Sequence, residues 1–375
     1  MRSSRPEGVA MKIASIETLP IAIPYDSGAA PLPLGGKPRT RMESLLVKVT
    51  TDDGIVGWGD AFGVRIWPVT RLLIDRLVAP LCVGEDALRR EDVIDKLDRT
   101  LYHFGRAGPL QYAISAIDIA LWDIAGKAAR RPVHGLIGPL RHARMPVYAS
   151  LLPYRDPNLA ARHAARAVDQ GYRYVKLHER DVPSVRESRA AIGADVGLMV
   201  DLNCPFDLPT AERFAREVAA FAPMWLEEPL FPVDDFSAMA ALSRRIDIPL
   251  AMGENVGNPV EFRRVLDSTG IAYAQPSAIK TGGITAMLEI ARDAAARDIR
   301  LMPHSAYFGP GLLATMHVLA TLPTSPILER FYCDMPVELS GGITLPRDGM
   351  VQVPDVPGLG FEPDPEVLRK YAATE

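Results

Sequence analysis

The stretch GLMVDLNCPFDLPTAERFAREVAAFAPMWLEE, residues 197–228, contains one full unit of a pattern that runs through most of the chain. A short apolar run, GLMVDLN, ends in polar residues and is followed by a segment with helical spacing, TAERFAREVAAF. A second apolar run, MWLEE, then ends in two acids. Short apolar runs that alternate with helical segments are typical of buried parallel strands. The stretch therefore predicts a strand–helix–strand unit.

The same unit repeats between about residues 141 and 340. Its apolar runs are, in order, VYAS (147–150), YVKLH (174–178), GLMVDLN (197–203), MWLEE (224–228), PLAMGE (249–254), IAYAQPS (271–277), IRLMPHS (299–305) and PILER (326–330). Segments with helical spacing lie between them, among them NLAARHAARAVDQG, VEFRRVLDS and ITAMLEIARDAAAR. Strands that alternate with helices in this way predict an α/β fold of the (β/α) barrel type.

Residues 11–140 follow a different order, with strands first and helices afterwards. MKIASIETLPIAIP and ESLLVKVTTDDGIVGWGDA are rich in β-forming residues, and Asp53-Gly54 supplies a hairpin turn. Apolar residues recur at helical spacing from Val69 to Lys127. This part is predicted to be a separate α+β domain. Residues 1–10 are expected to be a disordered extension, and residues 341–375, rich in Pro and Gly, a tail that packs back on the first domain.

Composition excludes several classes of protein. The net charge is only −4 with both signs interspersed, so nucleic acid is not an expected partner. The three cysteines, Cys82, Cys204 and Cys333, form no CxxC pair, which argues against a disulfide scaffold or zinc knuckle. No apolar run reaches membrane-spanning length and none resembles a signal peptide. A cytoplasmic protein without a membrane partner is expected.

Polar side chains follow the predicted strands, and barrel enzymes build their sites at the carboxyl ends of strands. Asp201, Glu227 and Glu254 end successive strands. Three carboxylates at one mouth would raise one another's pKa unless a cation neutralised them. Oxygen ligands without a nearby thiolate favour Mg²⁺. The alternative is three separate carboxylates that cap helices or form ion pairs.

Three further residues supply nitrogen bases. Lys176 and His178 are two residues apart on one strand, so both point toward the same face. Each would lower the pKa of the other, and either could be a general base. Lys176 could instead pair with a metal-ligand carboxylate. His304, in LMPHSAYFGPG, is expected across the barrel, where it could protonate a leaving hydroxide or a carbanion, or could be structural.

Glu329, in ILER, ends the last predicted strand. As a protonated acid it could donate to an enolate oxygen. It could equally be an ion-pair partner of Arg330 or of a lysine.

Taken together, these motifs resemble the enolase superfamily, in the branch of mandelate racemase and muconate lactonizing enzyme. AISAIDIALWDIAGKAARRPVHGLIG (113–138) is similar to the signature that ends the capping domain of that family. The runs VKLH, VDLN, WLEEP, MGEN, QPSAIKTGG, MPHSAYFG and ILER match its barrel strands in order. The resemblance extends from about Met11 to the C-terminus. It implies an N-terminal α+β capping domain on a modified (β/α)₇β barrel, and a homo-oligomer.

The resemblance also implies roles for individual residues. The family's Mg²⁺ ligands fall on Asp201, Glu227 and Glu254, and its enolate-stabilising acid falls on Glu329. Lys176 and His178 fall on its Lys-x-Lys or a related motif, and His304 falls on its opposing histidine. The loop at residues 25–40 is expected to be its specificity lid.

Two positions depart from the family pattern. His178 replaces the second lysine of Lys-x-Lys, and Ser277 stands where an aspartate of a His–Asp dyad or a catalytic lysine is expected. Lys280 aligns with a different family position and is not taken as the base. Without the carboxylate, His304 is poorly suited to abstract a proton but can still donate one. The departures favour asymmetric chemistry over racemisation.

The expected substrate is a small carboxylate, a sugar acid whose α-proton is removed and from which water is then lost to give a 2-keto acid. A cycloisomerase, racemase or epimerase acting through the same enediolate is the alternative, and a non-catalytic Mg²⁺-stabilised barrel is a third hypothesis. Tyr25, Asn203, Tyr307 and Ser277 are candidate substrate contacts. Tyr25, Asn203 and Tyr307 could instead pack or cap loops. Specificity is also expected around Arg65.

Overall fold

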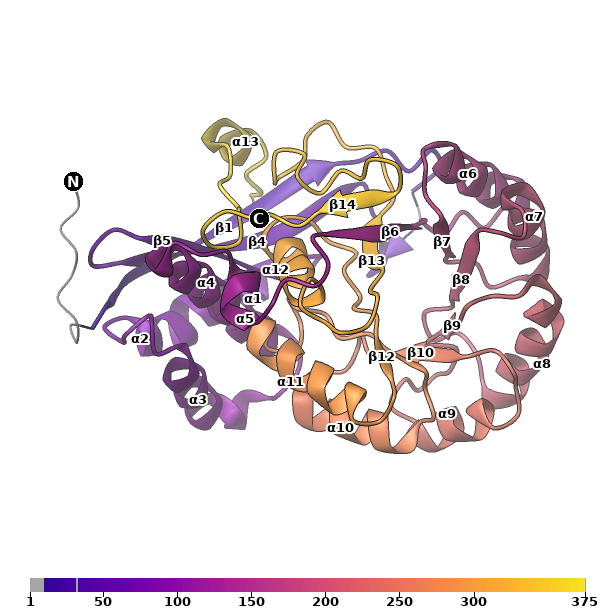
Figure 1. The fold of residues 1–375 in the computed structure, drawn as a ribbon, viewed down its shortest axis with the longest axis horizontal. Coiled ribbons are helices and arrows are strands. Elements are labelled where there is room, and N and C mark those ends of the chain that lie inside the picture. Colours follow the sequence, from indigo (N-terminus) through magenta and orange to yellow (C-terminus); the bar gives the residue numbers. More distant parts are fainter. Residues whose placement is uncertain (1–9, 32, 375) are drawn as a thin grey trace.

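The protein was analysed as a computed structural model that describes residues 10–31 and 33–374. The expected disorder of residues 1–10 falls almost wholly on residues 1–9, which lie outside the described residues. Figure 1 shows two bodies side by side, a sheet with helices and a ring of strands surrounded by helices. Among the described residues, no helix is long and apolar enough to cross a membrane.

The first body is an α+β unit, as expected. Strands β1 (Ile13–Pro24), β4 (Arg41–Thr51) and β5 (Val56–Phe62) form an antiparallel sheet in the order β1-β4-β5. The turn between β4 and β5 contains Gly54 at φ 82°, a left-handed conformation that glycine adopts readily. The helices that follow are α1 (Trp67–Leu73), η1 (Ile74–Val78), α2 (Ala79–Cys82), α3 (Arg90–Leu101), η2 (Tyr102–Phe104), α4 (Pro109–Ala129) and α5 (Val133–Ile137).

Helix α4 lies directly on strand β5 because that strand carries glycines on the facing side. A Cβ at Gly59 would come within 1.9 Å of the Ala116 carbonyl oxygen, and one at Gly57 within 2.3 Å of the Ala120 carbonyl oxygen. Larger side chains at either position would push the helix off the sheet. The GWG motif thus brings β5, which ends at the cavity described below, against the signature helix.

The second body contains eight parallel strands, which confirms the predicted (β/α)₇β barrel (Figure 1). The hydrogen-bonded order is β12-β11-β10-β9-β8-β7-β6-β13. The strands are β6 (Arg144–Ser150), β7 (Tyr174–Leu177), β8 (Gly197–Asp201), β9 (Leu226–Glu227), β10 (Leu250–Met252), β11 (Tyr273–Ala274), β12 (Arg300–Leu301) and β13 (Leu328–Phe331). The helices between them are α6 (Pro157–Asp169), α7 (Val182–Ile192), α8 (Leu208–Val218), η3 (Ala219–Phe221), α9 (Phe236–Ser243), α10 (Pro259–Ser268), α11 (Gly283–Ala295) and α12 (Pro310–Leu319).

Each barrel helix from α6 to α10 begins at an Asp or Asn whose side chain accepts a backbone N–H of the first turn. These caps fix where each loop ends and the helix starts. One cluster of buried apolar side chains in the barrel consists of Tyr148, Met199, Trp225, Ala251, Met302 and Ile327. The barrel therefore has a packed core.

The loop and the tail add contacts that the sequence did not specify. The loop at residues 25–40 contains a short hairpin of β2 (Pro33–Leu34) and β3 (Lys37–Pro38), and Asp26 exchanges backbone hydrogen bonds with Asp334. In the tail, β14 (Met350–Gln352) pairs with barrel strand β6, and helix α13 (Pro365–Lys370) precedes a backbone contact of Ala373 with Pro20 in β1. The tail thus touches both bodies.

Candidate active site

A cavity of about 730 Å³ lies at the carboxyl ends of the barrel strands and is lined by both bodies. Six of the predicted site residues line it, namely Tyr25, His178, Asn203, Glu254, His304 and Tyr307. The other five, Lys176, Asp201, Glu227, Ser277 and Glu329, are buried and do not line it. The predicted residues thus form two layers, one that faces the cavity and one beneath it.

The buried layer is organised around Lys176. Its Nζ lies 3.2 Å from Asp201 Oδ2, 2.9 Å from Glu227 Oε1 and 2.8 Å from Glu329 Oε1. Strands β8 and β9 pair Asp201 with Glu227 in register, so these two carboxylates stand side by side. Burial disfavours the ammonium, but the surrounding carboxylates outweigh it and raise the pKa of Lys176 well above its ordinary value. The expected net lowering of the pKa of Lys176 by His178 is wrong, and the contacts match the alternative that Lys176 pairs with a predicted metal-ligand carboxylate.

Glu329 takes the ion-pair role that was one of its two expected roles, with Lys176 as the lysine. Its Oε2 also accepts a hydrogen bond of 2.7 Å from the Ser305 N–H. Burial opposes ionisation of this carboxyl, but Lys176 and His304 outweigh burial and lower the pKa of Glu329. The carboxyl is therefore ionised in this arrangement.

Glu228 was not singled out from the sequence, although the Glu-Glu pair at the end of its strand was a signal. It is buried and accepts hydrogen bonds from Asn255 Nδ2 at 2.6 Å and from the Gly253 N–H at 3.2 Å. Burial, with Glu254 and Asp201 nearby, raises the pKa of Glu228 to about 7. Burial and Asp201 likewise raise the pKa of Glu227. The neighbouring cations therefore do not balance the negative charge that these carboxylates would carry if all were ionised.

The three predicted metal ligands do not surround one point in this arrangement. Lys176 lies between Asp201 and Glu227, and Glu254 Oε2 lies 2.8 Å from His304 Nε2. In the described part of the chain, no three His, Cys, Asp or Glu side chains are grouped as they would be around a metal ion. The metal-ligand set remains a prediction.

His178 is held by both ring nitrogens. Its Nδ1 contacts the Leu151 carbonyl oxygen and its Nε2 lies 3.0 Å from Asp201 Oδ2. A carbonyl can only accept, so Nδ1 must carry a proton. The other ring nitrogen, Nε2, is therefore the one directed at the acid cluster.

His304 is held by one nitrogen only. Its Nε2 faces Glu254, and burial of that carboxyl is outweighed by His304, so the pKa of Glu254 is lowered to about 2. The Nδ1 atom of His304 and the Oγ atom of Ser277 are both buried without a hydrogen-bond partner among the described residues. No carboxylate orients this ring from the position of Ser277, as the sequence implied.

The candidate substrate contacts already form hydrogen bonds within the protein. Asn203 donates to Asp201 Oδ1 through both its N–H and its Nδ2. Tyr25 Oη donates to the Arg39 carbonyl oxygen at 2.9 Å, and Tyr307 Oη accepts from the Ala278 N–H at 3.1 Å. Arg65 donates to the carbonyl oxygens of Lys37 and Pro38 and does not line the cavity. It braces the loop from outside.

Arg39 also lines the cavity and was missed from the sequence. No motif marks it, because only the path of the loop brings it over strand β13. Its guanidinium carbon lies 4.9 Å from the centre of the Phe331 ring.

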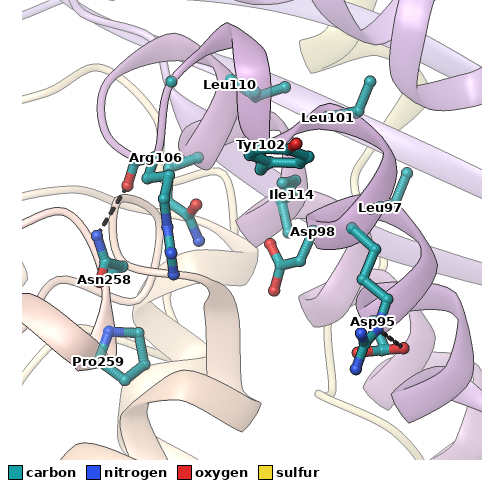
Figure 2. A pocket seen from close by; sticks show the side chains of 13 residues that line it. Asp95, Leu97, Asp98, Leu101, Tyr102, Arg106, Leu110, Ile114, Asn258 and Pro259 are labelled. Atoms are coloured by element: carbon teal, nitrogen blue, oxygen red, sulfur yellow. Dashed lines mark hydrogen bonds and ion pairs between the residues drawn. The ribbon is translucent and has the colours of Figure 1, made fainter.

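A second cavity of about 590 Å³ lies away from the strand ends, between helices α3 and α4 and the start of α10 (Figure 2). Asn258 Nδ2 donates to the Arg106 carbonyl oxygen at 3.0 Å across its edge (Figure 2). None of the predicted site residues lines this cavity. The strand-end cavity is therefore the candidate active site.

Two family models together match most of the chain. The enolase C-terminal domain-like model matches residues 159–367, and the N-terminal domain model of mandelate racemase / muconate lactonizing enzyme matches residues 23–138. The two matched segments correspond to the barrel and to the α+β unit.

Similar proteins with a name include two dehydratases and a cycloisomerase. A D-galactonate dehydratase of Ralstonia nicotianae is 31% identical over 85% of this chain and 88% of its own length. An L-talarate/galactarate dehydratase of Salmonella typhimurium is 30% identical over 92% and 87%. A 3,6-anhydro-alpha-L-galactonate cycloisomerase of Streptomyces coelicolor is 29% identical over 88% and 91%.

A solved structure extends the likeness to the whole fold. A mandelate racemase/muconate lactonizing protein from Paracoccus denitrificans, complexed with magnesium, superposes with a TM-score of 0.83 at 27% identity. The match covers 97% of this chain and 98% of that one. The chain belongs to the mandelate racemase / muconate lactonizing enzyme family of the enolase superfamily.

Proposed function

We propose that this chain is a Mg²⁺-dependent dehydratase that removes the α-proton of a sugar acid and eliminates water to give a 2-keto acid. The observation that carries the proposal is that His178 and His304 line one cavity from separate strands, above a buried acid cluster. Dehydratases of two sugar acids are among the similar proteins, at 30% and 31% identity.

The residues present fit a divalent cation bound by oxygen atoms. The carboxylates at the strand ends are Asp201, Glu227, Glu228 and Glu329, which are buried, and Glu254, which lines the cavity; Lys176, His178 and His304 contact them. The raised pKa values of Glu227 and Glu228 indicate acid that these cations do not neutralise. Asp201, Glu227 and Glu254 would hold the ion. Bound Mg²⁺ would stabilise the negative charge that develops on the substrate carboxylate.

His178 is the better placed of the two candidate bases. It lines the cavity, whereas the Lys176 side chain is fully buried and surrounded by carboxylates. Nδ1 is committed to the Leu151 carbonyl oxygen, so Nε2 would take the α-proton once Asp201, which lies 3.0 Å from it here, holds the metal instead. The electron pair of the broken C–H bond then forms the enediolate. Lys176, in contact with Glu329, would hold that acid in place beneath it.

His304 supplies the second proton. The C3–O bond breaks as His304 protonates the departing hydroxyl, which leaves as water, and the enol product tautomerises to the 2-keto acid. Contact with the Glu254 carboxylate fixes the orientation of the ring. With Ser277 in place of a carboxylate, no acid supports Nδ1 as a dyad would.

The cycloisomerase remains the second candidate, because a cycloisomerase is among the similar proteins at 29% identity. Proton NMR in D₂O separates the two. A dehydratase converts the acid sugar to a keto acid with loss of water, a cycloisomerase gives a product of unchanged mass, and an epimerase exchanges the α-proton without losing water.

The direct test is a panel of acid sugars assayed for keto-acid formation with Mg²⁺ and with EDTA. We expect turnover of at least one acid with Mg²⁺ only, and loss of turnover in Lys176→Ala. No turnover across a broad panel, or near-normal turnover of that variant, would contradict the proposal. The expected homo-oligomer is tested separately by light scattering.

A further inference from the structure

Arg39 is a half-buried cation inside the candidate active site. It lies near the end of the loop at residues 25–40, two residues before strand β4, and it lines the same cavity as His178 and His304. Its guanidinium stacks over the Phe331 ring at 4.9 Å and lies 6.0 Å from the centre of the Tyr25 ring. The two rings pack edge to face at 5.8 Å and form an aromatic seat for the cation.

No ion pair joins Arg39 to a carboxylate of the described residues, and its buried Nε has no hydrogen-bond partner among them. Glu43, which lines the same cavity, is near enough to raise the pKa of Arg39 but forms no ion pair with it. The one acceptor of its side chain is the weak Met42 sulfur at 3.4 Å. Burial lowers the pKa of Arg39 accordingly. Arg330, by contrast, pairs with Glu338 at 2.6 Å. Partial burial of a guanidinium without an ion-pair partner is costly, so an anion that enters the cavity would be stabilised by Arg39.

Arg39 lies where the far end of a bound substrate would reach. The proposed metal ligands end strands β8 and β9 and follow β10, whereas Phe331 is on β13, at one end of the strand order. Phe331 lies two residues beyond Glu329, an advance of about 6.6 Å along the strand. An extended six-carbon chain spans roughly 6 Å, so a substrate whose carboxylate is at the acid cluster can reach toward Arg39 with its other end.

We infer that Arg39 binds a second carboxylate at the distal end of the substrate, so that the preferred substrate is a dicarboxylic sugar acid. The inference rests on the proposed function for the identity of the reacting end. A planar guanidinium matches a carboxylate with two parallel hydrogen bonds, which a terminal hydroxyl cannot accept equally well. The similar proteins do not decide between a substrate with one carboxylate and a substrate with two, since one is named for D-galactonate and another for galactarate.

The test compares matched pairs of six-carbon acids that share every stereocentre and differ only at C6, a carboxylate in the aldarate and a CH₂OH group in the aldonate. Binding to the Mg²⁺-loaded protein is measured by calorimetry for each pair. The wild-type protein is expected to bind at least one aldarate about tenfold or more tightly than its aldonate. In Arg39→Gln that preference should fall to within about threefold, while aldonate binding changes little.

Two further variants keep the result interpretable. Arg39→Lys retains the positive charge without the planar guanidinium and should keep part of the preference for the aldarate. Arg41→Gln removes an exposed arginine two residues away and should leave the preference intact. A wild-type protein that binds no aldarate more tightly than its aldonate, or an Arg39→Gln variant that weakens both equally, would overturn the inference. Aldarate binding that depends on Arg39 without α-proton exchange would instead overturn the proposed function alone.

Discussion

At the scale of single residues, the two histidines are held in different ways, and this difference underlies the asymmetry of the proposed reaction. His178 has its Nδ1 fixed by the Leu151 carbonyl oxygen, so its Nε2 faces the acid cluster in one tautomer. His304 has no partner at Nδ1 among the described residues and contacts a carboxylate at Nε2. Both rings contact a carboxylate through Nε2, so the difference lies at Nδ1. The fixed Nδ1 of His178 suits a base held in one orientation, and the ring of His304 is left to the proton-donating role.

This asymmetry predicts that substitutions of the two histidines affect α-proton exchange and keto-acid formation differently. We expect His178→Gln to lower both α-proton exchange in D₂O and keto-acid formation by roughly 10²–10⁴-fold, because the base is lost. His304→Gln should lower keto-acid formation by a similar factor but keep exchange within about tenfold. Proton NMR measures both on one sample. Loss of exchange in His304→Gln with retention in His178→Gln would reverse the assignment.

At the scale of elements, the signature helix α4 is tied to barrel helix α11 through one threonine. Thr285 donates to Asp118 through its N–H at 3.0 Å and through Oγ1 at 2.5 Å, and Trp122 Nε1 donates to Oγ1 at 3.0 Å. Burial raises the pKa of Asp118 to about 6 despite these donors. The signature segment therefore holds the two bodies together.

Thr285→Val keeps the shape of the side chain and removes the hydroxyl. We expect the free energy of unfolding to fall by about 1–3 kcal/mol, because Asp118 and Trp122 each lose a buried partner. Denaturant titration measures the change. Thr321→Val is the control, since that hydroxyl contacts only the Val318 carbonyl oxygen, and about 0.5 kcal/mol or less is expected. Equal effects of the two substitutions would contradict the role given to Thr285.

A second tie joins the first body to the start of helix α10. Asn258 accepts from the Glu261 N–H at 3.1 Å as the helix cap and donates to the Arg106 carbonyl oxygen at 3.0 Å. Asn258→Ala should cost about 2 kcal/mol of stability, roughly half from the cap and half from the second bond. Asn258→Asp keeps the cap and should cost less. Thermal unfolding of both variants tests this order, and a larger loss in Asn258→Asp would contradict it.

The elements were predictable from the sequence because their signals are local. Strands as short as Leu226–Glu227 were found from the apolar run before the polar end, and the acids at those ends were found with them. Two contacts in the candidate site could not be predicted from the sequence. Arg39 reaches Phe331 across 292 residues of chain through an irregular loop, and no periodicity describes such a path. The pairing of Lys176 with three acids depends on strand register, which spacing alone does not give.

At the scale of the whole molecule, stability and metal binding are expected to be linked through the acid cluster. The pKa of Glu228 is raised from 4.5 to about 7, chiefly by burial, so the folded protein keeps a proton that the unfolded chain releases. The free energy of unfolding should therefore fall as pH rises through this range. Below about pH 6.5 the buried His317, whose pKa is lowered to about 4 mainly by burial, acts in the opposite sense.

Mg²⁺ binds the ionised cluster, so its stabilising effect should grow as pH rises from 6.5 to 8. We expect the increase in Tm on adding Mg²⁺ to EDTA-treated protein to be larger at pH 8 than at pH 6.5. Taking the difference with and without metal removes the contribution of His317, which contacts Leu359 and His134 and not the acids. Asp201→Asn should abolish the Mg²⁺ effect at both pH values, whereas Glu228→Gln should retain it with a weaker dependence on pH. A Mg²⁺-induced increase that is equal at the two pH values, or that survives in Asp201→Asn, would place the ion elsewhere in the molecule.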